Sequence, residues 1–502
     1  MNNIRVAYSG LISFIVGLFS IFTGLVFVLI VTRTLSAEEY GTWSLITNLI
    51  FYLVISETII GFWSHRQVAR GEEVGKTAFI SSGIFSLGAI PFYLALSYII
   101  GTQSNANVDF LIFGVIWLPI YFVSQTLGGI NIGHRPQAVS YSFLIFEIVK
   151  IPTALAFVYF LELGVEGAII SITLAYLIRI IVQIKFARPK LKNKFDIQIL
   201  KRWIRLSWIA LYSTLTRVIV LLDVMIYPLI TSSVLGVAYY SAALTIAALS
   251  GHSASIAQAL SPKLLAKGNL EHIPKNLSLM MYFAVPLLGI SILFAKPGLF
   301  ALNPIYESVF IIAILLSFKI FLFYFNAVFR NILESLETVD LEQNPKFSQL
   351  IKSKLFAIPT GRYINSFLYL FIFSIVIFFL YSSGMEELEL VTWWAILSLS
   401  FEIPFFIFLI IMLKKKVRIL FESIRILKYI FATTIFGFFF YFTSDFIINY
   451  EISIFKLLPT LIVEFILCGI VYLVITYFID KNTRILFKTV TNEFRLFRKS
   501  ND

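Results

Sequence analysis

Long apolar runs separated by short polar stretches follow one another along the whole chain. Most runs are about 20 residues long, the length that an α-helix needs to cross the hydrocarbon core of a membrane. The alternating segments of about ten residues that are typical of membrane β-barrels do not dominate. The pattern therefore predicts an all-α polytopic membrane protein with about fourteen transmembrane helices. The predicted spans cover approximately residues 6–32, 39–62, 77–100, 109–130, 137–161, 165–187, 203–230, 237–260, 277–296, 305–329, 362–381, 390–413, 428–446 and 456–479.

The composition supports a membrane protein. Of the 502 residues, 59% are hydrophobic and only 14% are charged, whereas about a quarter of the residues are charged in a typical soluble protein. The single cysteine, Cys468, lies within an apolar run. It excludes an internal disulfide and a cysteine-based metal cluster, so we expect neither a metal nor a cofactor.

The basic residues indicate the orientation of the chain. Most of the 40 Lys and Arg residues fall in alternate loops and in the C-terminal tail, and the opposite loops carry only Arg33, Lys296 and Lys456. By the positive-inside rule, we expect a multi-pass protein of the cytoplasmic membrane with both termini in the cytoplasm. Topology thus accounts for the net charge of +12, and no nucleic-acid partner is expected. The first apolar run is too long for a signal-peptide core and counts as a span.

A stretch dense in basic residues after the sixth predicted span, from Lys185 to Arg205, is the best internal boundary. Near the C-terminus, apolar residues at helical spacing among basic ones predict an amphipathic helix at the membrane surface. The predicted parts are a six-helix bundle (1–187), a basic cytoplasmic linker (188–202), a second six-helix bundle (203–413), two further transmembrane helices (414–480) and a basic amphipathic tail (481–502).

A short motif occurs at the first hairpin of each predicted bundle. The segment Ser36–Ser44 joins spans one and two, and the segment Thr231–Ser241 joins spans seven and eight. Each has a polar turn, a glycine (Gly41 or Gly236), then an aromatic and a small residue entering a helix. We expect each glycine to serve a tight turn at the membrane surface. The repetition predicts two parallel six-helix repeats.

At these residues the sequence resembles a known family. The segment Val31–Ser44 is similar to the first hairpin of Wzx-type polysaccharide flippases, which belong to the multidrug/oligosaccharidyl-lipid/polysaccharide exporter superfamily. Further similar segments are Leu163–Gly167, Asp223, Leu235–Gly236, Tyr240–Ala243 and Ser261–Lys263. The resemblance implies two six-helix bundles facing each other across a central cavity, plus two C-terminal helices. It also implies transport of a lipid-linked oligosaccharide by alternating access. The loop Asn331–Gly361 is longer than the family pattern.

Charged residues within the predicted spans are the candidate site, because each costs about 2.5–3.5 kcal/mol at mid-membrane and needs a partner or a wet cavity. The candidate substrate-binding cations are Arg217, Lys319, Arg179 and Lys150, and the candidate coupling or cavity charges are Asp223, Glu57, Glu147 and Glu402. Structural pairing is the alternative role for each. Glu147 and Lys150, at i and i+3, can neutralise one another. Asp223 lies about 120° around a helix from Arg217, so these two are not expected to pair directly.

Four intramembrane cations suit an anionic headgroup such as a diphosphate. We therefore predict a flippase that moves a polyprenyl- or dolichyl-(pyro)phosphate-linked oligosaccharide from the cytoplasmic to the outer leaflet for cell-surface polysaccharide or glycan biosynthesis. Its expected partners are that substrate, membrane lipids and polysaccharide-assembly enzymes. One alternative is a multidrug or organic-cation exporter of the same superfamily; another is a membrane-embedded glycosyltransferase or ligase. The enzyme alternative is disfavoured because the outer acidic cluster Glu386–Glu389 is interpreted as a solvated loop. The sequence has no phosphate-binding Walker motif, so ATP hydrolysis is not expected.

Overall fold

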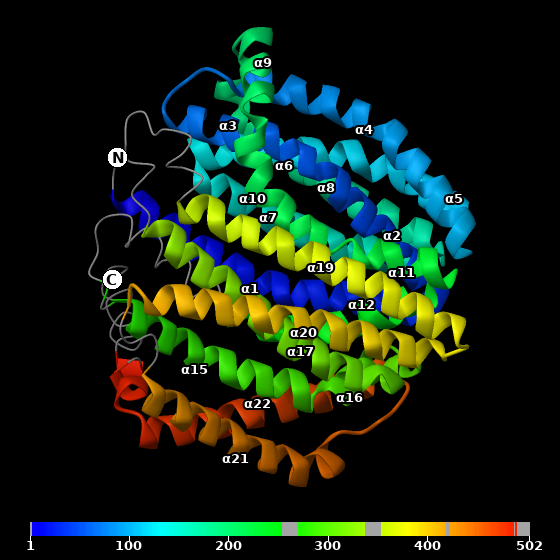
Figure 1. Ribbon diagram of the computed structural model, residues 1–502, viewed down its shortest axis with the longest axis vertical. Coiled ribbons are helices and arrows are strands. Elements are labelled where there is room, and N and C mark those ends of the chain that lie inside the picture. Colours follow the sequence, from blue (N-terminus) through cyan, green and yellow to red (C-terminus); the bar gives the residue numbers. More distant parts are fainter. Residues whose placement is uncertain are drawn as a thin grey trace. The chain divides into compact units, whose positions relative to one another are not determined.

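The computed structural model describes residues 3–253, 270, 272–336, 353–417, 422–485 and 487–488, and every regular element within these ranges is a helix (Figure 1). The helices up to residue 253 are α1 (Asn3–Thr34), α2 (Ala37–Val54), η1 (Ile55–Glu57), α3 (Thr58–Ala69), α4 (Gly75–Ser104), α5 (Val108–Phe113), η2 (Gly114–Ile116), α6 (Trp117–His134), α7 (Pro136–Ala154), η3 (Leu155–Phe160), α8 (Gly164–Ala187), η4 (Arg188–Leu191), α9 (Ile197–Arg205), α10 (Ser207–Val220), α11 (Asp223–Thr231), α12 (Leu235–Ala247) and η5 (Ala248–Ser253). Those that follow are α15 (His272–Leu293), α16 (Ala295–Leu302), η6 (Pro304–Val309), α17 (Phe310–Ser335), α19 (Lys354–Ser382), α20 (Glu387–Lys414), α21 (Ser423–Ile447) and α22 (Ile454–Ile479).

Twelve helical segments are long and apolar enough to cross a membrane. They are Ala37–Ala69, Gly75–Ser104, Val108–His134, Pro136–Phe160, Gly164–Leu191, Thr214–Thr231, Ile273–Leu293, Pro304–Ser335, Phe356–Ser382, Glu387–Lys414, Ser423–Ile447 and Ile454–Ile479. Each overlaps one of the predicted spans. The first predicted span corresponds to α1, whose apolar stretch Phe22–Thr34 is shorter, and the eighth extends beyond Ser253 into residues outside the description. The all-helical polytopic class is therefore confirmed, and the count of fourteen stays a prediction.

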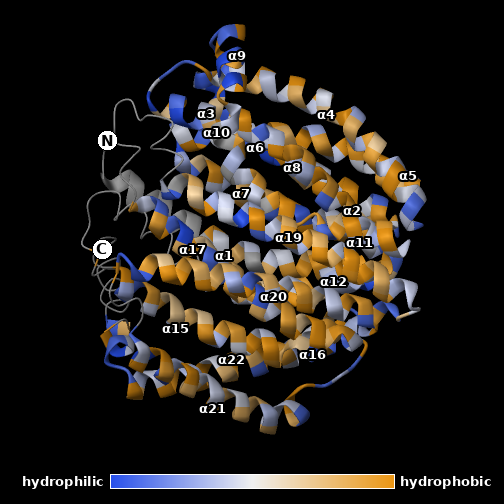
Figure 2. Ribbon diagram, in the orientation of Figure 1, coloured by the Kyte–Doolittle hydropathy of each residue, from blue (hydrophilic) through white to orange (hydrophobic). Residues whose placement is uncertain are grey.

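Hydrophobic residues run along most of these helices, while hydrophilic residues gather on α9 and at helix ends (Figure 2). Large apolar side chains also face outward: Phe379 is 67% exposed and Phe446 is 90% exposed. Such side chains are rarely gathered on the outside of a water-soluble protein. Their exposure fits helices that are surrounded by lipid.

The contacts divide the chain into two compact units. Unit 1 consists of Met1–Ser241 with Arg362–Trp393, and unit 2 consists of Ala242–Gly361 with Trp394–Asp502. A buried cluster that includes Ile60, Leu127 and Trp203 lies in unit 1. Unit 2 has two such clusters, one around α17 and α20 and one around α15, α21 and α22. The five-part division predicted from sequence stays a prediction.

The two repeated glycines serve close packing rather than a turn. Gly41 lies in α2 and Gly236 lies in α12, whereas the left-handed residue between α11 and α12 is Ser232, with φ of 53°. A Cβ on Gly41 would lie 2.3 Å from the Val234 carbonyl oxygen, and one on Gly236 would lie 2.3 Å from the Tyr227 ring. The expected tight-turn role is thus wrong, because each glycine admits a neighbour at a distance that no side chain allows.

The start of α2 explains the polar part of the first motif. The Glu39 backbone N–H donates to Ser36 Oγ at 3.2 Å, and the Ser36 N–H donates to Glu39 Oε2 at 2.9 Å. This capping box satisfies two backbone donors that the helix itself leaves unpaired. Ser36 is therefore the N-cap residue that fixes the first residue of α2.

Candidate functional site

The best-defined charged cluster lies in unit 1, where α1, α7 and α8 pack together. Lys150 Nζ lies 2.6 Å from Glu147 Oε2, and both side chains are less than a tenth exposed. Glu147 Oε1 also accepts a hydrogen bond of 3.0 Å from Ser20 Oγ, and Oε2 accepts one from Thr23 Oγ1. The carboxylate is thus held by one cation and two hydroxyl groups, which offset its removal from water.

A second buried cation lies beside this pair. The Arg179 guanidinium carbon lies 5.3 Å, 5.9 Å and 5.6 Å from the ring centroids of Phe143, Phe146 and Tyr176. Lys150 Nζ lies 5.2 Å from the same Phe146 centroid. Cations within about 6 Å of an aromatic face are attracted to its electron-rich centre. Two cations therefore share one ring, and among the described residues Glu147 forms an ion pair with Lys150.

The aromatic wall extends further from Arg179. Tyr176 contacts Tyr121 at a centroid distance of 5.2 Å and Trp117 at 6.1 Å, and Trp117 stacks on Trp43 at 5.9 Å. Arg179 Nε is buried and has no hydrogen-bond partner within the part of the chain that the structure describes. We define Lys150, Glu147, Arg179, Phe146 and Tyr176 as the cation–aromatic cluster. It carries a net positive charge and one unused buried donor.

Two further acidic residues of unit 1 are buried and accept hydrogen bonds from other helices. Glu57, at the end of η1, accepts a 2.6 Å hydrogen bond from Thr126 Oγ1 of α6. Asp223 Oδ2 accepts one of 2.6 Å from the Tyr369 hydroxyl of α19. Its Oδ1 accepts one of 2.9 Å from the Val224 N–H. Asp223 thus starts α11 and ties that helix to α19.

The predicted continuous span 203–230 is wrong in detail. Trp203 belongs to α9, and a new helix begins at Ser207. Between α10 and α11, Leu221 and Leu222 keep right-handed helical dihedrals, but their N–H groups bond three residues back instead of four. Irregular backbone within a membrane is tolerated where other groups satisfy its polar atoms. Here the Tyr52 hydroxyl donates to the Leu221 carbonyl oxygen. Arg217 lies in α10, and its side chain lies outside the described part of the structure.

The remaining candidates belong to unit 2. Lys319 on α17 and Glu402 on α20 are buried, with exposures of 6% and 3%. Asn326 Nδ2 donates a 2.8 Å hydrogen bond to Glu402 Oε2. Lys319 and Asn326 are seven residues apart on α17, so they lie on one face two turns apart. Within unit 1, by comparison, Glu147, Lys150 and Arg179 gather in the cation–aromatic cluster. Glu57 contacts α6, and Asp223 contacts α19.

Sequence reasoning missed the neutral partners of the charges: Tyr369, Asn326, Thr126, and the rings of Phe146 and Tyr176. Only Ser20 carried a signal, as part of a small-residue stripe in the first predicted span. Aromatic and hydroxyl residues are too frequent in this chain, with 52 Phe and 24 Tyr, for position alone to mark a partner. Among the described residues no group of His, Cys, Asp and Glu could hold a metal ion.

The fold is similar to that of solved membrane transporters. It is similar to the lipid II flippase MurJ in an inward closed conformation, with a TM-score of 0.63 and 14% identity over 94% of this chain and 99% of that one. It is also similar to an inward-facing multidrug resistance transporter of the MATE family, with a TM-score of 0.57 and 15% identity over 79% of this chain and 96% of that one. At these identities the likeness concerns the fold.

Residues 6–266, just over half of the 502-residue chain, match the model of the polysaccharide biosynthesis protein family, and the chain belongs to that family. The resemblance to Wzx-type proteins noted from the hairpin motifs is thereby confirmed. No curated protein matches the chain.

Proposed function

We propose that this protein moves a polyprenyl- or dolichyl-(pyro)phosphate-linked oligosaccharide from the cytoplasmic to the outer leaflet by alternating access, for cell-surface polysaccharide or glycan biosynthesis. The family match and the MurJ-like fold support a flippase. The proposal includes fourteen spans, arranged as two six-helix bundles and two C-terminal helices, with both termini in the cytoplasm. Polysaccharide-assembly enzymes are the expected partners.

The observation that carries the proposal is the excess positive charge of the cation–aromatic cluster. Lys150 and Arg179 lie over the same Phe146 ring, and Glu147 balances one of the two charges. A buried guanidinium is costly unless an anion or an aromatic face compensates it. A diphosphate supplies that anion and accepts hydrogen bonds from the unused Arg179 Nε. We therefore assign headgroup binding first to Arg179, with Lys150, Arg217 and Lys319 as further cations.

One observation favours the exporter of organic cations. Glu57 is buried, and its carboxylate accepts a hydrogen bond from the neutral side chain of Thr126. Glu402 is a second buried carboxylate. Buried carboxylates with neutral donors are suited to binding a cation or a proton. In a flippase, the same residues, together with Asp223, would couple transport to an ion gradient.

The test is flipping of a fluorescent lipid-linked oligosaccharide in proteoliposomes, with and without proton, sodium and voltage gradients. Arg179→Gln should lower the flipping rate at least tenfold, because removing the donor leaves the diphosphate without its main charge-assisted bonds. Lys185→Gln is the matched control. It removes the same charge from an exposed site on the same helix and should flip at the wild-type rate.

Two results would decide against the proposal. If the Arg179→Gln protein flips the lipid at the wild-type rate, the cation–aromatic cluster does not bind the substrate headgroup. Failure to flip any lipid-linked glycan, combined with export of a soluble organic cation that Glu57→Gln abolishes, would establish the exporter instead.

A further inference from the structure

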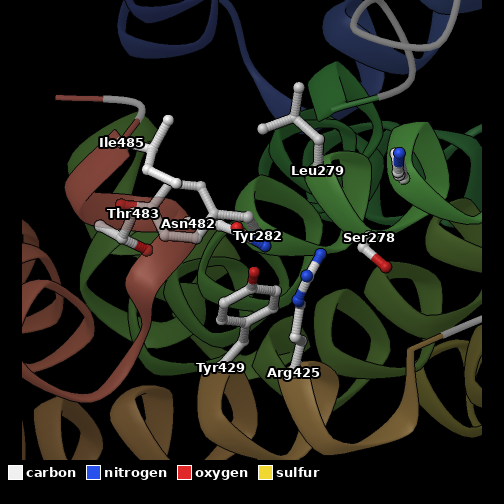
Figure 3. A pocket seen from close by; sticks show the side chains of 9 residues that line it. Ser278, Leu279, Tyr282, Arg425, Tyr429, Asn482, Thr483 and Ile485 are labelled. Atoms are coloured by element: carbon white, nitrogen blue, oxygen red, sulfur yellow. The ribbon is translucent and has the colours of Figure 1, made fainter. Parts of the chain in front are cut away.

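A cavity of about 340 Å³ lies in unit 2, and none of the candidate charged residues described above lines it. It is bounded by α15, α21 and the segment that follows α22. Arg425 and Tyr429 extend from α21 towards α15 and towards Asn482 and Thr483, which close the opposite wall (Figure 3). The pair Arg425 and Tyr429, at i and i+4, presents a guanidinium and a hydroxyl group on one face of the helix.

Two cations line the cavity, and the carboxylates of Glu422 and Asp480 contact Arg425 and the Tyr429 hydroxyl without lining it. Lys275 and Arg425 line it, and none of its nine lining residues is acidic. Arg425 is oriented by an ion pair with Glu422. With the Asn482 amide oxygen turned towards it, Arg425 also donates at 2.9 Å from Nε and 2.8 Å from Nη2. The guanidinium is therefore held in place at the cavity rather than free to turn into solvent.

A buried polar group in the wall lacks a partner. Ser278 is 2% exposed, and its Oγ makes no hydrogen bond within the described part of the chain. A buried hydroxyl without a hydrogen bond destabilises the folded protein, so such a group is expected to meet a ligand or a water molecule. Ser278 lies one turn from Lys275 on α15, so one ligand can reach both.

The cavity lies where three spans end. Lys275 follows the first residue of the span Ile273–Leu293 by two positions, Arg425 is two residues into Ser423–Ile447, and Ile485 lies six residues beyond Ile454–Ile479. The ends of apolar spans lie at the level of the lipid headgroups. Leu279 and Ile485 add apolar surface to the same walls. Basic, hydroxyl and apolar groups thus meet at headgroup depth.

We propose that this cavity binds the phosphate ester of an anionic phospholipid headgroup, with Lys275, Arg425 and Ser278 as its donors and with Leu279 and Ile485 against the glycerol end of the acyl chains. A zwitterionic headgroup fits poorly, because its quaternary amine would meet two cations and no lining carboxylate. None of these residues is assigned to transport, so the site does not rest on the proposed function.

The test measures thermal unfolding of the full-length protein in neutral detergent during titration with dioleoylphosphatidylglycerol. A ligand that binds the folded state raises Tm in a saturable way. Lys275→Gln should weaken the apparent affinity about fivefold, the effect of one basic residue near a membrane surface, and Ser278→Ala should weaken it too. Lys414→Gln, which removes an exposed charge at the end of α20 outside the cavity, should bind like the wild type.

Two parallel titrations identify the ligand. Dioleoylphosphatidylcholine should give a smaller rise in Tm, and glycerol 3-phosphate should give little, because it lacks acyl chains to contact Leu279 and Ile485. An equal rise with glycerol 3-phosphate would overturn the lipid as the source of the phosphate. An equal rise with phosphatidylcholine, or unchanged affinity in both Lys275→Gln and Ser278→Ala, would overturn the site itself.

Discussion

Gly41 and Val234 bring the first hairpin of the chain against the link between α11 and α12: a Cβ on Gly41 would lie 2.3 Å from the Val234 carbonyl oxygen. The two copies of the hairpin motif thus meet at a glycine of one copy. Backbones can approach this closely only where the side chain is absent, which is how small residues act at helix contacts in membranes.

Gly41→Ala should therefore destabilise the protein by about 1–3 kcal/mol, the usual cost of overpacking. The measurement is the change in Tm in detergent. Gly83→Ala is the control: Gly83 lies in α4 with no atom within 4 Å of the added Cβ. There the better helix propensity of alanine should leave stability unchanged or slightly higher. Equal effects of the two substitutions would contradict the role of the Val234 contact.

Glu147→Gln should destabilise unit 1 more strongly than the double substitution Glu147→Gln with Lys150→Met. The single change leaves the Lys150 ammonium buried at 7% exposure without its carboxylate, and an unpaired buried charge costs about 3–5 kcal/mol. The double change removes both charges. Denaturation of the three proteins in the same detergent compares their stabilities. If the single and double variants are equally stable, burial of the Lys150 ammonium does not require the Glu147 carboxylate.

Much of this fold could be predicted from the sequence, because span length and basic loops are strong one-dimensional signals. Twelve spans were located from apolar runs alone. The pairing partners could not be predicted in the same way. Glu147 and Lys150 are adjacent on one helix and could be paired by spacing, whereas Asp223 and Tyr369 are 146 residues apart and meet only in the folded chain.

The same limit explains the error at residues 203–230. Hydropathy is continuous through Leu221 and Leu222, so nothing in the pattern marks a break there. The junction of α10 and α11 coincides with two tertiary hydrogen bonds, from Tyr52 to the Leu221 carbonyl oxygen and from Tyr369 to Asp223. Such bonds can outweigh local helix propensity, which differs by less than about 1 kcal/mol per residue.

Tyr369→Phe should loosen the start of α11. It removes the 2.6 Å hydrogen bond to Asp223 Oδ2 while keeping the ring. Hydrogen bonds between membrane helices contribute about 0.6 kcal/mol on average and up to about 1.7 kcal/mol. The expected readout is a lower Tm together with faster hydrogen exchange at Val224 and Met225. Tyr381→Phe, at an exposed position on the same helix, should change neither, and an equal change there would assign the effect to α19 in general.

The predicted orientation can be tested with engineered thiols, because the single native cysteine is suitably placed. Cys468 is 1% exposed, so the wild-type protein should react little with a membrane-impermeant maleimide. Lys194→Cys lies in the basic segment after α8, and Ser383→Cys lies between α19 and α20; both positions are exposed. With both termini in the cytoplasm, the positive-inside rule places residue 194 inside and residue 383 outside. Intact cells should therefore label Ser383→Cys, and Lys194→Cys should label only after permeabilisation. The reverse order would invert the topology, and with it the direction in which the proposed flippase presents its basic loops to the substrate.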